Sequence, residues 1–450
     1  MRKRIQLSAE EVKKLCAEDD KYVLKSWSRK PDAPLIVGGD GAYIYDAKGK
    51  KIMDFSSQLV NVNIGYGNRK VIEAIKKQAD EMPYVSGIYR SLPVIKLAKK
   101  LEEISPEGIC KTFFTTGGGA AVESAIKIAK QYTGRSKIVA LWDSYHGSTL
   151  GALSATGVTH IRTAFEPLLP GFVHAPPPYC YRCPFRKDYP GCGIECAEFV
   201  EKTIRWEGPQ TIAAFIAEPI LANKFIVPPK EYWPMVREIC DKYGIVMIFD
   251  EVITGFGRTG KMFGCEHFNV VPDIIVAGKG ITSGYLPLGA ALVNRKIGDY
   301  FDETPMQHGF TYAHHPMSCA AGVAEIDVLL EEKLVGNASR VGAHLMAQLK
   351  ELEVRHKCIG DVRGLGLLTG IEMVADRRTK ELLSKQFTKE DITVYIRKKT
   401  YEKGLEAGSS TQFAPGILRL CPPLCVTKEE VDSAIGIVDD VLFDVDSKIA

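Results

Sequence analysis

Two side chains suited to imine chemistry follow short apolar runs in this chain. Asp250 stands at the end of one run, within residues 244–260, and Lys279 stands just past another, within residues 272–290. A lysine amine forms an imine with an aldehyde, and a carboxylate can hold a pyridine nitrogen in its protonated form. The pair therefore predicts the two protein anchors of pyridoxal phosphate.

The surroundings of both residues are typical of a parallel sheet. In each stretch a short run rich in β-branched residues ends in a polar residue and then glycines. Such runs suit strands that are buried on both faces, and ligands gather at the carboxyl ends of these strands. Taken singly, Asp250 could instead cap a helix and Lys279 could be a solvated loop residue, because most Asp and Lys side chains are structural or exposed.

Three further segments favour a cofactor site. Residues 113–120 form a glycine-rich turn before a helical pattern over 121–132, where Glu123 and Lys127 have the spacing of an i,i+4 ion pair. Backbone N–H groups at such a helix start suit a phosphate. A second segment, residues 143–147, follows a predicted strand and offers an aromatic ring that could stack on a flat ligand. A third, residues 308–312, offers a threonine hydroxyl to a phosphate oxygen.

From about residue 20 to the C-terminus, these motifs in this order resemble the class III pyridoxal-phosphate aminotransferases, the omega-aminotransferase group of fold type I. The resemblance implies that Lys279 is the Schiff-base lysine and Asp250 the partner of the pyridine nitrogen. It implies the following further contacts: Gly118 and Gly119 to the phosphate, Val252 and Tyr145 on the two ring faces, Glu218 near the ring, Thr311 to the phosphate held by a neighbouring subunit, Arg419 to the substrate carboxylate, and Trp27 and Tyr145 lining the substrate pocket.

The activity that this resemblance implies is amino-group transfer by a ping-pong mechanism. The donor would be an omega-amino acid or an amine, the acceptor an α-oxo acid such as pyruvate or 2-oxoglutarate, and the enzyme a homodimer. A racemase, an aminomutase or a lyase that uses the same cofactor would need the same lysine and aspartate, so these alternatives stay open.

The chain departs from parts of the family pattern. Relatives that act on 4-aminobutyrate or ornithine carry a gate glutamate that pairs the carboxylate-binding arginine, and this chain has Asn223 there. Asn223 cannot neutralise Arg419. Ile253 replaces a glutamine that touches the ring hydroxyl, and Gly117 stands where a serine is frequent. We therefore expect Arg419 to move outward, or to bind a solvent anion, when the site holds an amine without a carboxylate.

The whole chain fits an α/β protein. Its 450 residues carry a net charge of +3, which points to no polyanionic partner, nucleic acid included. No stretch is long enough to span a membrane, and no signal peptide is evident, so a cytoplasmic enzyme is expected. We expect an N-terminal segment (1–55), a large cofactor domain with a mostly parallel sheet (56–330) and a small C-terminal domain (331–450). Residues 1–55 and 331–450 would together form a small α+β domain.

Two other motifs need interpretation. Residues 255–261 nearly spell a phosphate-binding P-loop, but Met262 stands where the metal-binding Ser or Thr is needed. A nucleotide-binding protein is thus a distant alternative.

A proline-rich segment holds a cluster of cysteines, namely Cys180, Cys183, Cys192 and Cys196. Four thiolates can bind zinc or form disulfides, but only half of this spacing matches common zinc patterns, so reduced thiols in a surface insertion are favoured.

Overall fold

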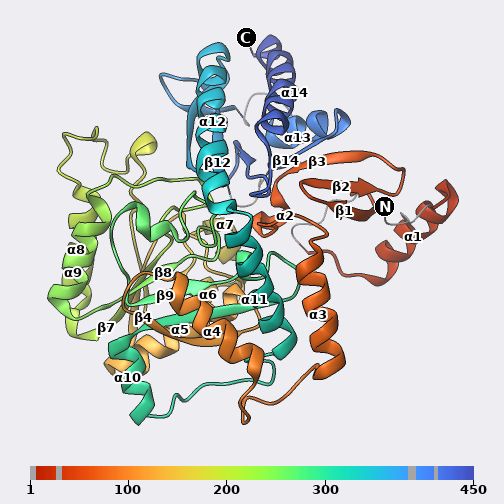
Figure 1. Ribbon diagram of the computed structural model, residues 1–450. Coiled ribbons are helices and arrows are strands. Elements are labelled where there is room, and N and C mark those ends of the chain that lie inside the picture. Colours follow the sequence, from red (N-terminus) through yellow and green to blue (C-terminus); the bar gives the residue numbers. More distant parts are fainter. Residues whose placement is uncertain (1–6, 27–32, 384–391, 410–413, 450) are drawn as a thin grey trace.

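The computed structural model describes residues 7–26, 33–383, 392–409 and 414–449. Two sheets organise this part of the chain (Figure 1). The larger sheet has seven strands in the order β4-β10-β9-β8-β7-β5-β6. In chain order these are β4 (Ile109–Thr115), β5 (Lys137–Leu141), β6 (Phe172–Ala175), β7 (Ile212–Ala217), β8 (Val246–Asp250), β9 (Ile274–Ala277) and β10 (Gly289–Asn294).

Helices cover the larger sheet, and its central strands are buried as expected. Every residue of β7, β8 and β9 is buried, because the sheet is shielded on both faces. All neighbouring pairs are parallel except those of β10, which runs antiparallel to β4 and β9. The helices of this half are α3 (Arg69–Glu81), α4 (Leu92–Ile104), α5 (Gly118–Thr133), α6 (Leu150–Ala155), α7 (Thr159–Arg162), α8 (Glu195–Glu207), α9 (Tyr232–Tyr243), α10 (Arg295–Glu303) and α11 (Pro316–Glu331).

The smaller sheet combines both ends of the chain. Its order is β1-β2-β3-β14-β15-β12-β11, with β13 paired to β12. Its strands are β1 (Ile36–Asp40), β2 (Tyr43–Asp46), β3 (Lys51–Phe55), β11 (Ile359–Leu365), β12 (Leu368–Asp376), β13 (Glu381–Leu382), β14 (Leu405–Ser409) and β15 (Ile417–Leu420). The remaining helices are α1 (Ala9–Tyr22), α2 (Ser57–Val60), α12 (Leu334–Arg355), α13 (Ile392–Glu402) and α14 (Lys428–Lys448).

The junction of the two chain ends is the pairing of β3 with β14. These strands are parallel, so the N-terminal hairpin β2–β3 extends a sheet built by the C-terminal part, as Figure 1 shows in red beside blue. The architecture confirms the expected α/β fold, with a large mostly parallel sheet and a smaller α+β layer from both termini. The domain boundaries at residues 55 and 330 stay predictions.

One local expectation was wrong. Glu123 does not pair with Lys127. Its Oε1 accepts the N–H groups of Gly151 and Ala152 at 2.8 and 3.0 Å and so holds the start of α6, while Lys127 Nζ lies 3.3 Å from the His308 ring. An exposed i,i+4 ion pair would stabilise the helix only slightly. Leaving the N–H groups at the start of α6 without an acceptor would cost more free energy, so Glu123 binds them instead.

The P-loop alternative for residues 255–261, which Met262 already disfavoured, is not supported by the structure. The segment is a series of turns that leads into a short 3₁₀ helix at Gly264–His267, so no helix start presents N–H groups to a phosphate. Its arginine, Arg258, is fully buried and donates to Leu367 O, Pro422 O and the Asn63 side chain at 3.2, 2.5 and 2.9 Å. The segment therefore ties the large sheet to the C-terminal part.

Candidate active site

The predicted lysine and aspartate lie on neighbouring strands at the carboxyl edge of the larger sheet. Asp250 is the last residue of β8 and is in register with Val276 of β9. Lys279 follows β9 after Gly278, in a single 3₁₀ turn. Parallel strands end at the same edge, so the two side chains meet there as the sequence indicated.

Asp250 is buried and held by two donors. Its Oδ2 accepts a hydrogen bond from His146 Nδ1 at 2.8 Å, and its Oδ1 accepts the Val252 N–H at 3.1 Å. His146 is also buried, and its Nε2 has no hydrogen-bond partner among the described residues. These contacts fix the orientation of the carboxylate. Sequence reasoning gave His146 no role, because the contact spans 104 positions, and its only signal was its place beside Tyr145.

Lys279 is held in a strained and partly dehydrated position. Its φ is 42°, in the left-handed region that non-glycine residues rarely adopt. Burial lowers the pKa of its ammonium group to about 8, although the negative charge of Asp250 opposes this shift. Its Nζ forms no ion pair within the described parts of the chain. A lysine whose pKa lies near neutral pH can act at such a strand end both as a nucleophile and as a proton carrier.

Glycines pack closely beside this pair. An added Cβ on Gly118 would lie 2.9 Å from Val252 Cγ1, and one on Gly278 would lie 3.2 Å from Gly118 Cα. A Cβ on Gly147 would lie 2.9 Å from Gly119 Cα. These close approaches bring the start of α5 against the ends of β8 and β9. Among the described residues no side chain caps α5, so its first N–H groups can donate to an anion, which is the role expected of Gly118 and Gly119.

Glu218 organises the loop that carries Tyr145. It is buried after β7, and its two oxygens accept the N–H groups of Tyr145 and Ala222, each at 3.0 Å. Burial raises the pKa of the Glu218 carboxyl to about 7. A charge on His146 opposes this rise, and the negative charge of Asp250 adds to the rise. The carboxylate of Glu218 thus positions the aromatic loop beside Asp250.

Arg419 of β15 reaches the same region from the smaller sheet. Its guanidinium contributes to lowering the pKa of Lys279, so the two groups are electrostatically coupled. Its Nε is buried and lacks a hydrogen-bond partner among the described residues. Arg258, in contrast, is surrounded by carbonyl oxygens. A buried N–H donor of a guanidinium that lacks an acceptor is costly, so the unpaired Nε of Arg419 suits an incoming anion.

Two predicted residues are not part of this cluster as described. Thr311 is exposed on a loop, where Tyr84 Oη donates to its backbone oxygen at 2.8 Å. Its predicted contact is to the cofactor of a neighbouring subunit and is not tested by a single chain. Trp27, the other predicted substrate-pocket residue, lies outside the described residues.

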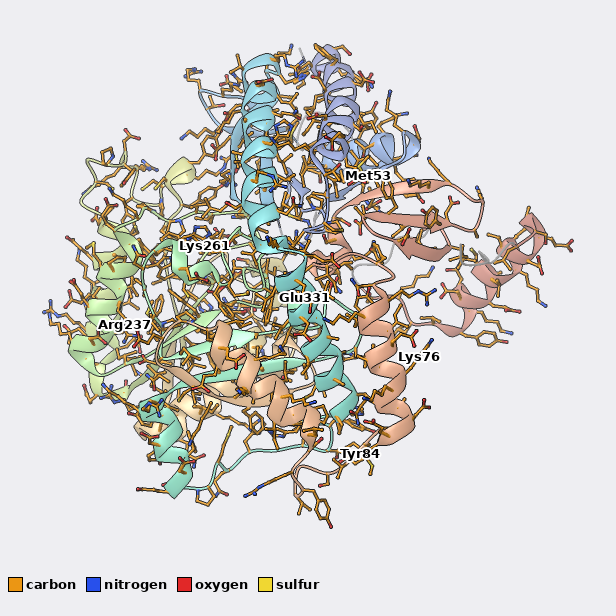
Figure 2. All side chains as sticks on the ribbon, in the orientation of Figure 1. Met53, Lys76, Tyr84, Arg237, Lys261 and Glu331 are labelled. Carbon is orange, nitrogen blue, oxygen red and sulfur yellow. The ribbon has the colours of Figure 1, made fainter. Side chains whose placement is uncertain are left out.

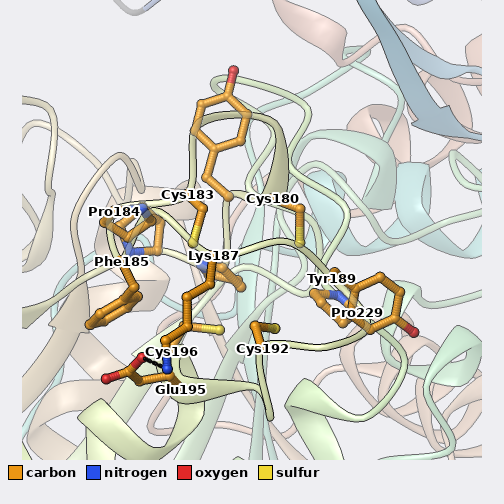
Figure 3. A pocket seen from close by; sticks show the side chains of 13 residues that line it. Cys180, Cys183, Pro184, Phe185, Lys187, Tyr189, Cys192, Glu195, Cys196 and Pro229 are labelled. Carbon is orange, nitrogen blue, oxygen red and sulfur yellow. Dashed lines mark ion pairs between the residues drawn. The ribbon is translucent and has the colours of Figure 1, made fainter.

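The cysteine cluster forms a separate pocket. Figure 3 shows the side chains of Cys180, Cys183, Cys192 and Cys196 around one space, which Phe185 and several prolines also line. All four are free thiols. Within the described residues, no three histidine, cysteine, aspartate or glutamate side chains are arranged to hold a metal ion. The geometry therefore does not support the zinc interpretation.

The insertion that carries these cysteines is anchored to the smaller sheet. Glu372 of β12 is buried and accepts Arg182 Nε at 2.5 Å and Arg363 at 2.6 Å. Tyr179 Oη also donates to Glu372. The network links the segment before Cys183 to strands β11 and β12, which indicates a structural role for the insertion.

The carboxyl-edge cluster fits pyridoxal phosphate. The uncapped start of α5 suits its phosphate, Asp250 suits its ring nitrogen and Lys279 its aldehyde. The close packing of Gly118 against Val252 and Gly278 brings the start of α5 next to the residues that adjoin Asp250 and Lys279. Separately, none of the described helices is long and apolar enough to cross a membrane.

Comparisons with known proteins agree with this site. The family model for class-III aminotransferases matches residues 27–442. A probable aminotransferase of Mycobacterium tuberculosis is 38% identical over 428 residues, 92% of this chain and 91% of that protein. The leucine/methionine racemase of Thermococcus litoralis is 36% identical over 427 residues, 93% of each chain. The solved taurine:2-oxoglutarate aminotransferase of Bifidobacterium kashiwanohense, in complex with PLP and glutamate, superposes with a TM-score of 0.93 at 36% identity, covering 99% of this chain and 100% of that one. This chain therefore belongs to the class III aminotransferases, enzymes that use pyridoxal phosphate.

Proposed function

We propose that the carboxyl-edge cluster transfers an amino group from an omega-amino acid or an amine to an α-oxo acid, with Lys279 as the covalent anchor of the cofactor. The observation that carries this proposal is the half-buried Lys279 just past β9, the strand next to β8, which ends at Asp250 of the buried Asp250–His146 pair. Bound pyridoxal phosphate supplies an electron sink for the electron pair that a departing proton leaves on the substrate carbon.

The chain's own groups would move the proton and hold the charge. Lys279 Nζ, once released from the cofactor, takes a proton from the substrate carbon as a base and returns it as an acid. Asp250 holds a positive charge on the ring nitrogen, and His146 keeps the carboxylate in place by donating to Oδ2. The N–H groups of Gly118 and Gly119 would bind the phosphate, and Val252 and Tyr145 would face the ring.

Arg419 would bind the carboxylate of the oxo acid. A guanidinium can donate two parallel hydrogen bonds to a carboxylate, a geometry that a lysine cannot match. The absence of a partner for its buried Nε supports this role. The acceptor class is also supported by the solved relative that acts on taurine and 2-oxoglutarate.

A donor panel tests the proposal. Purified holoenzyme is incubated with ω-amino acids and primary amines, each with pyruvate or 2-oxoglutarate, and amino-acid product is measured together with the cofactor absorbance. We expect transfer that depends on the oxo acid. Turnover of one amino-acid enantiomer into the other without an oxo acid would instead support a racemase, an alternative that the relative from Thermococcus litoralis favours.

We further propose a homodimer. Tyr84 lies at the lower edge of the molecule in Figure 2. Its ring meets the Tyr312 ring edge-on, with the two ring centroids 6.1 Å apart. Nearby in the chain, Ile88 and Tyr89 are 87% and 68% exposed. Exposed apolar side chains mark interaction surfaces. Tyr84 also donates to the backbone oxygen of Thr311, the residue predicted to reach a second subunit. A cytoplasmic location stays a prediction.

A further inference from the structure

The smaller sheet presents two charged side chains and a glycine on one face beside the site. Glu406 and Gly408 are two positions apart on β14, so they share a face, while Leu405 and Ala407 point into the apolar core on the other. Gly408 is in register with Arg419 of the neighbouring strand β15. Arg419 and Glu406 therefore lie on adjacent strands of the same sheet, offset by two residues.

The absence of a side chain on Gly408 lets the arginine lie across β14. An added Cβ there would lie 3.1 Å from both Cβ and Nε of Arg419. The guanidinium stem thus crosses directly over Gly408, which lies two residues from Glu406 on the same face of β14. Any larger residue at 408 would displace it.

Glu406 is buried but not fully paired. Its side chain is 11% exposed, and its Oε1 accepts Arg397 Nε from α13 at 2.6 Å. No hydrogen bond to its Oε2 is found within the described residues. Asp54 on the adjacent strand β3 is in register with Glu406. Its carboxylate already accepts hydrogen bonds from Ser56 N–H and from Tyr66 Oη, the latter at 2.6 Å. Glu406 is consequently the carboxylate with a free oxygen beside Arg419.

The electrostatics of the two groups agree with this geometry. Burial raises the pKa of the Glu406 carboxyl, and the charges of Arg397 and Arg419 oppose that shift. Burial lowers the pKa of the Arg419 guanidinium, and Glu406 opposes it. Each group therefore favours the charged form of the other, although the two do not form a direct ion pair.

We propose that Glu406 is the internal counter-charge of Arg419: it balances the arginine when an amine without an α-carboxylate occupies the site, and it is replaced by the carboxylate when an oxo acid binds. The proposal rests on the proposed role of Arg419 in oxo-acid binding. It places the counter-charge on β14 of the smaller sheet, whereas the loop after β7 carries Asn223, whose Nδ2 donates to Asp143 O at 3.4 Å.

The test is the variant Glu406→Gln in the holoenzyme, which keeps the shape and removes the charge. Single-turnover kinetics are measured for each half-reaction, one with a primary monoamine and one with pyruvate. Without Glu406 the arginine is unbalanced until a carboxylate arrives. We expect kcat/KM for the monoamine to fall about tenfold and pyruvate to bind about tenfold more tightly, the effect of roughly one pKa unit of charge interaction. The exposed Glu402→Gln on α13 is the matched control and should change neither.

Opposite shifts are the signature of a counter-charge, because a merely structural residue would weaken both half-reactions together. Equal losses, or no change in either, would overturn the proposal. If Glu406→Gln fails to fold, the variant Arg397→Gln provides a second test of the counter-charge by the same kinetic measurements. It frees Glu406 for Arg419 and should weaken pyruvate binding, and unchanged or tighter binding would count against the proposal. A wild-type enzyme that transfers no amino group to any oxo acid would overturn the proposed function itself, and this inference with it.

Discussion

Burial favours the reactive form of the side chain at Lys279 and disfavours it in the cysteine pocket. At the carboxyl edge of the larger sheet, burial lowers the pKa of Lys279 to about 8 and so favours the neutral amine, which is the nucleophile. In the cysteine pocket, burial raises the pKa of the Cys180 thiol and raises that of Cys196 to about 12. This disfavours the thiolate, which is the reactive form of cysteine.

The surroundings of the two clusters differ in the same sense. Lys279 lies beside an oriented carboxylate, an uncapped helix start and a buried arginine, all from different elements. The cysteines are surrounded by one another, by prolines and by Phe185. Reactive residue types form a site only where other elements supply the charges and donors that the reaction needs. The predictions below test this contrast.

The largest effect is expected for Lys279→Ala. The variant should lose turnover by more than about 10⁴-fold, because proton transfer by a positioned group alone contributes up to roughly that factor. It should still bind pyridoxal phosphate non-covalently. The exposed Lys261→Ala is the control and should keep wild-type activity. Borohydride reduction followed by peptide mapping gives the attachment site, and a label on another lysine would refute the assignment.

Asp250→Asn should have the next largest effect. It removes the negative charge while keeping the size, and we expect kcat to fall by roughly 10²- to 10³-fold, as for other charge-stabilising groups in active sites. Steady-state kinetics on the holoenzyme measure this, with the surface variant Asp241→Asn on α9 as the control. Near-wild-type turnover would mean that the ring nitrogen does not face Asp250.

Arg419→Ala should separate the two half-reactions. Losing a bidentate, charge-assisted contact should weaken the oxo-acid half-reaction by about 10- to 100-fold, while the half-reaction with a carboxylate-free amine changes much less. Single-turnover absorbance changes report each half-reaction. Equal losses would assign Arg419 to the fold or to the cofactor instead of the carboxylate.

The shifted pKa of Lys279 predicts a pH dependence. Below pH 8 the side chain is mainly the ammonium ion, which cannot attack an aldehyde, and above pH 8 it is the free amine. Covalent attachment of pyridoxal phosphate to cofactor-free protein should accelerate by about tenfold per pH unit below that value and level off above it. Stopped-flow absorbance measures the rate. A midpoint near the ordinary lysine value would show that Lys279 is not dehydrated.

The smallest effect on chemistry is expected in the cysteine pocket. Replacing Cys180, Cys183, Cys192 and Cys196 by Ser should leave kcat within about twofold and lower the free energy of unfolding by roughly 1–3 kcal/mol, the range of most destabilising substitutions. Denaturant unfolding and metal analysis of the wild type test this. Stoichiometric zinc, with activity lost on chelation, would make the pocket part of the function and break the comparison.

The sequence by itself determined the parts of the protein that depend on local pattern. Apolar runs ending in Asp250 and before Lys279 predicted parallel strands, and the common edge of those strands predicted the meeting of the two side chains. The glycine-rich turn at Gly118 predicted a phosphate-binding helix start. Each inference needed only the period of a strand or helix and the residue that ends it, because strand direction and side-chain alternation follow from the backbone.

Only the tertiary structure decided which partners these residues have. His146 holds Asp250 across 104 positions, Glu123 caps α6 instead of pairing with Lys127, and Glu406 reaches the surroundings of Arg419 through the pairing of β14 with β15. Such contacts join segments that have no shared pattern, and the cost of burying an unpaired charge or N–H group selects them from many possible pairs. The counter-charge of Arg419, which the sequence left open at Asn223, is therefore sought on a strand of the other sheet.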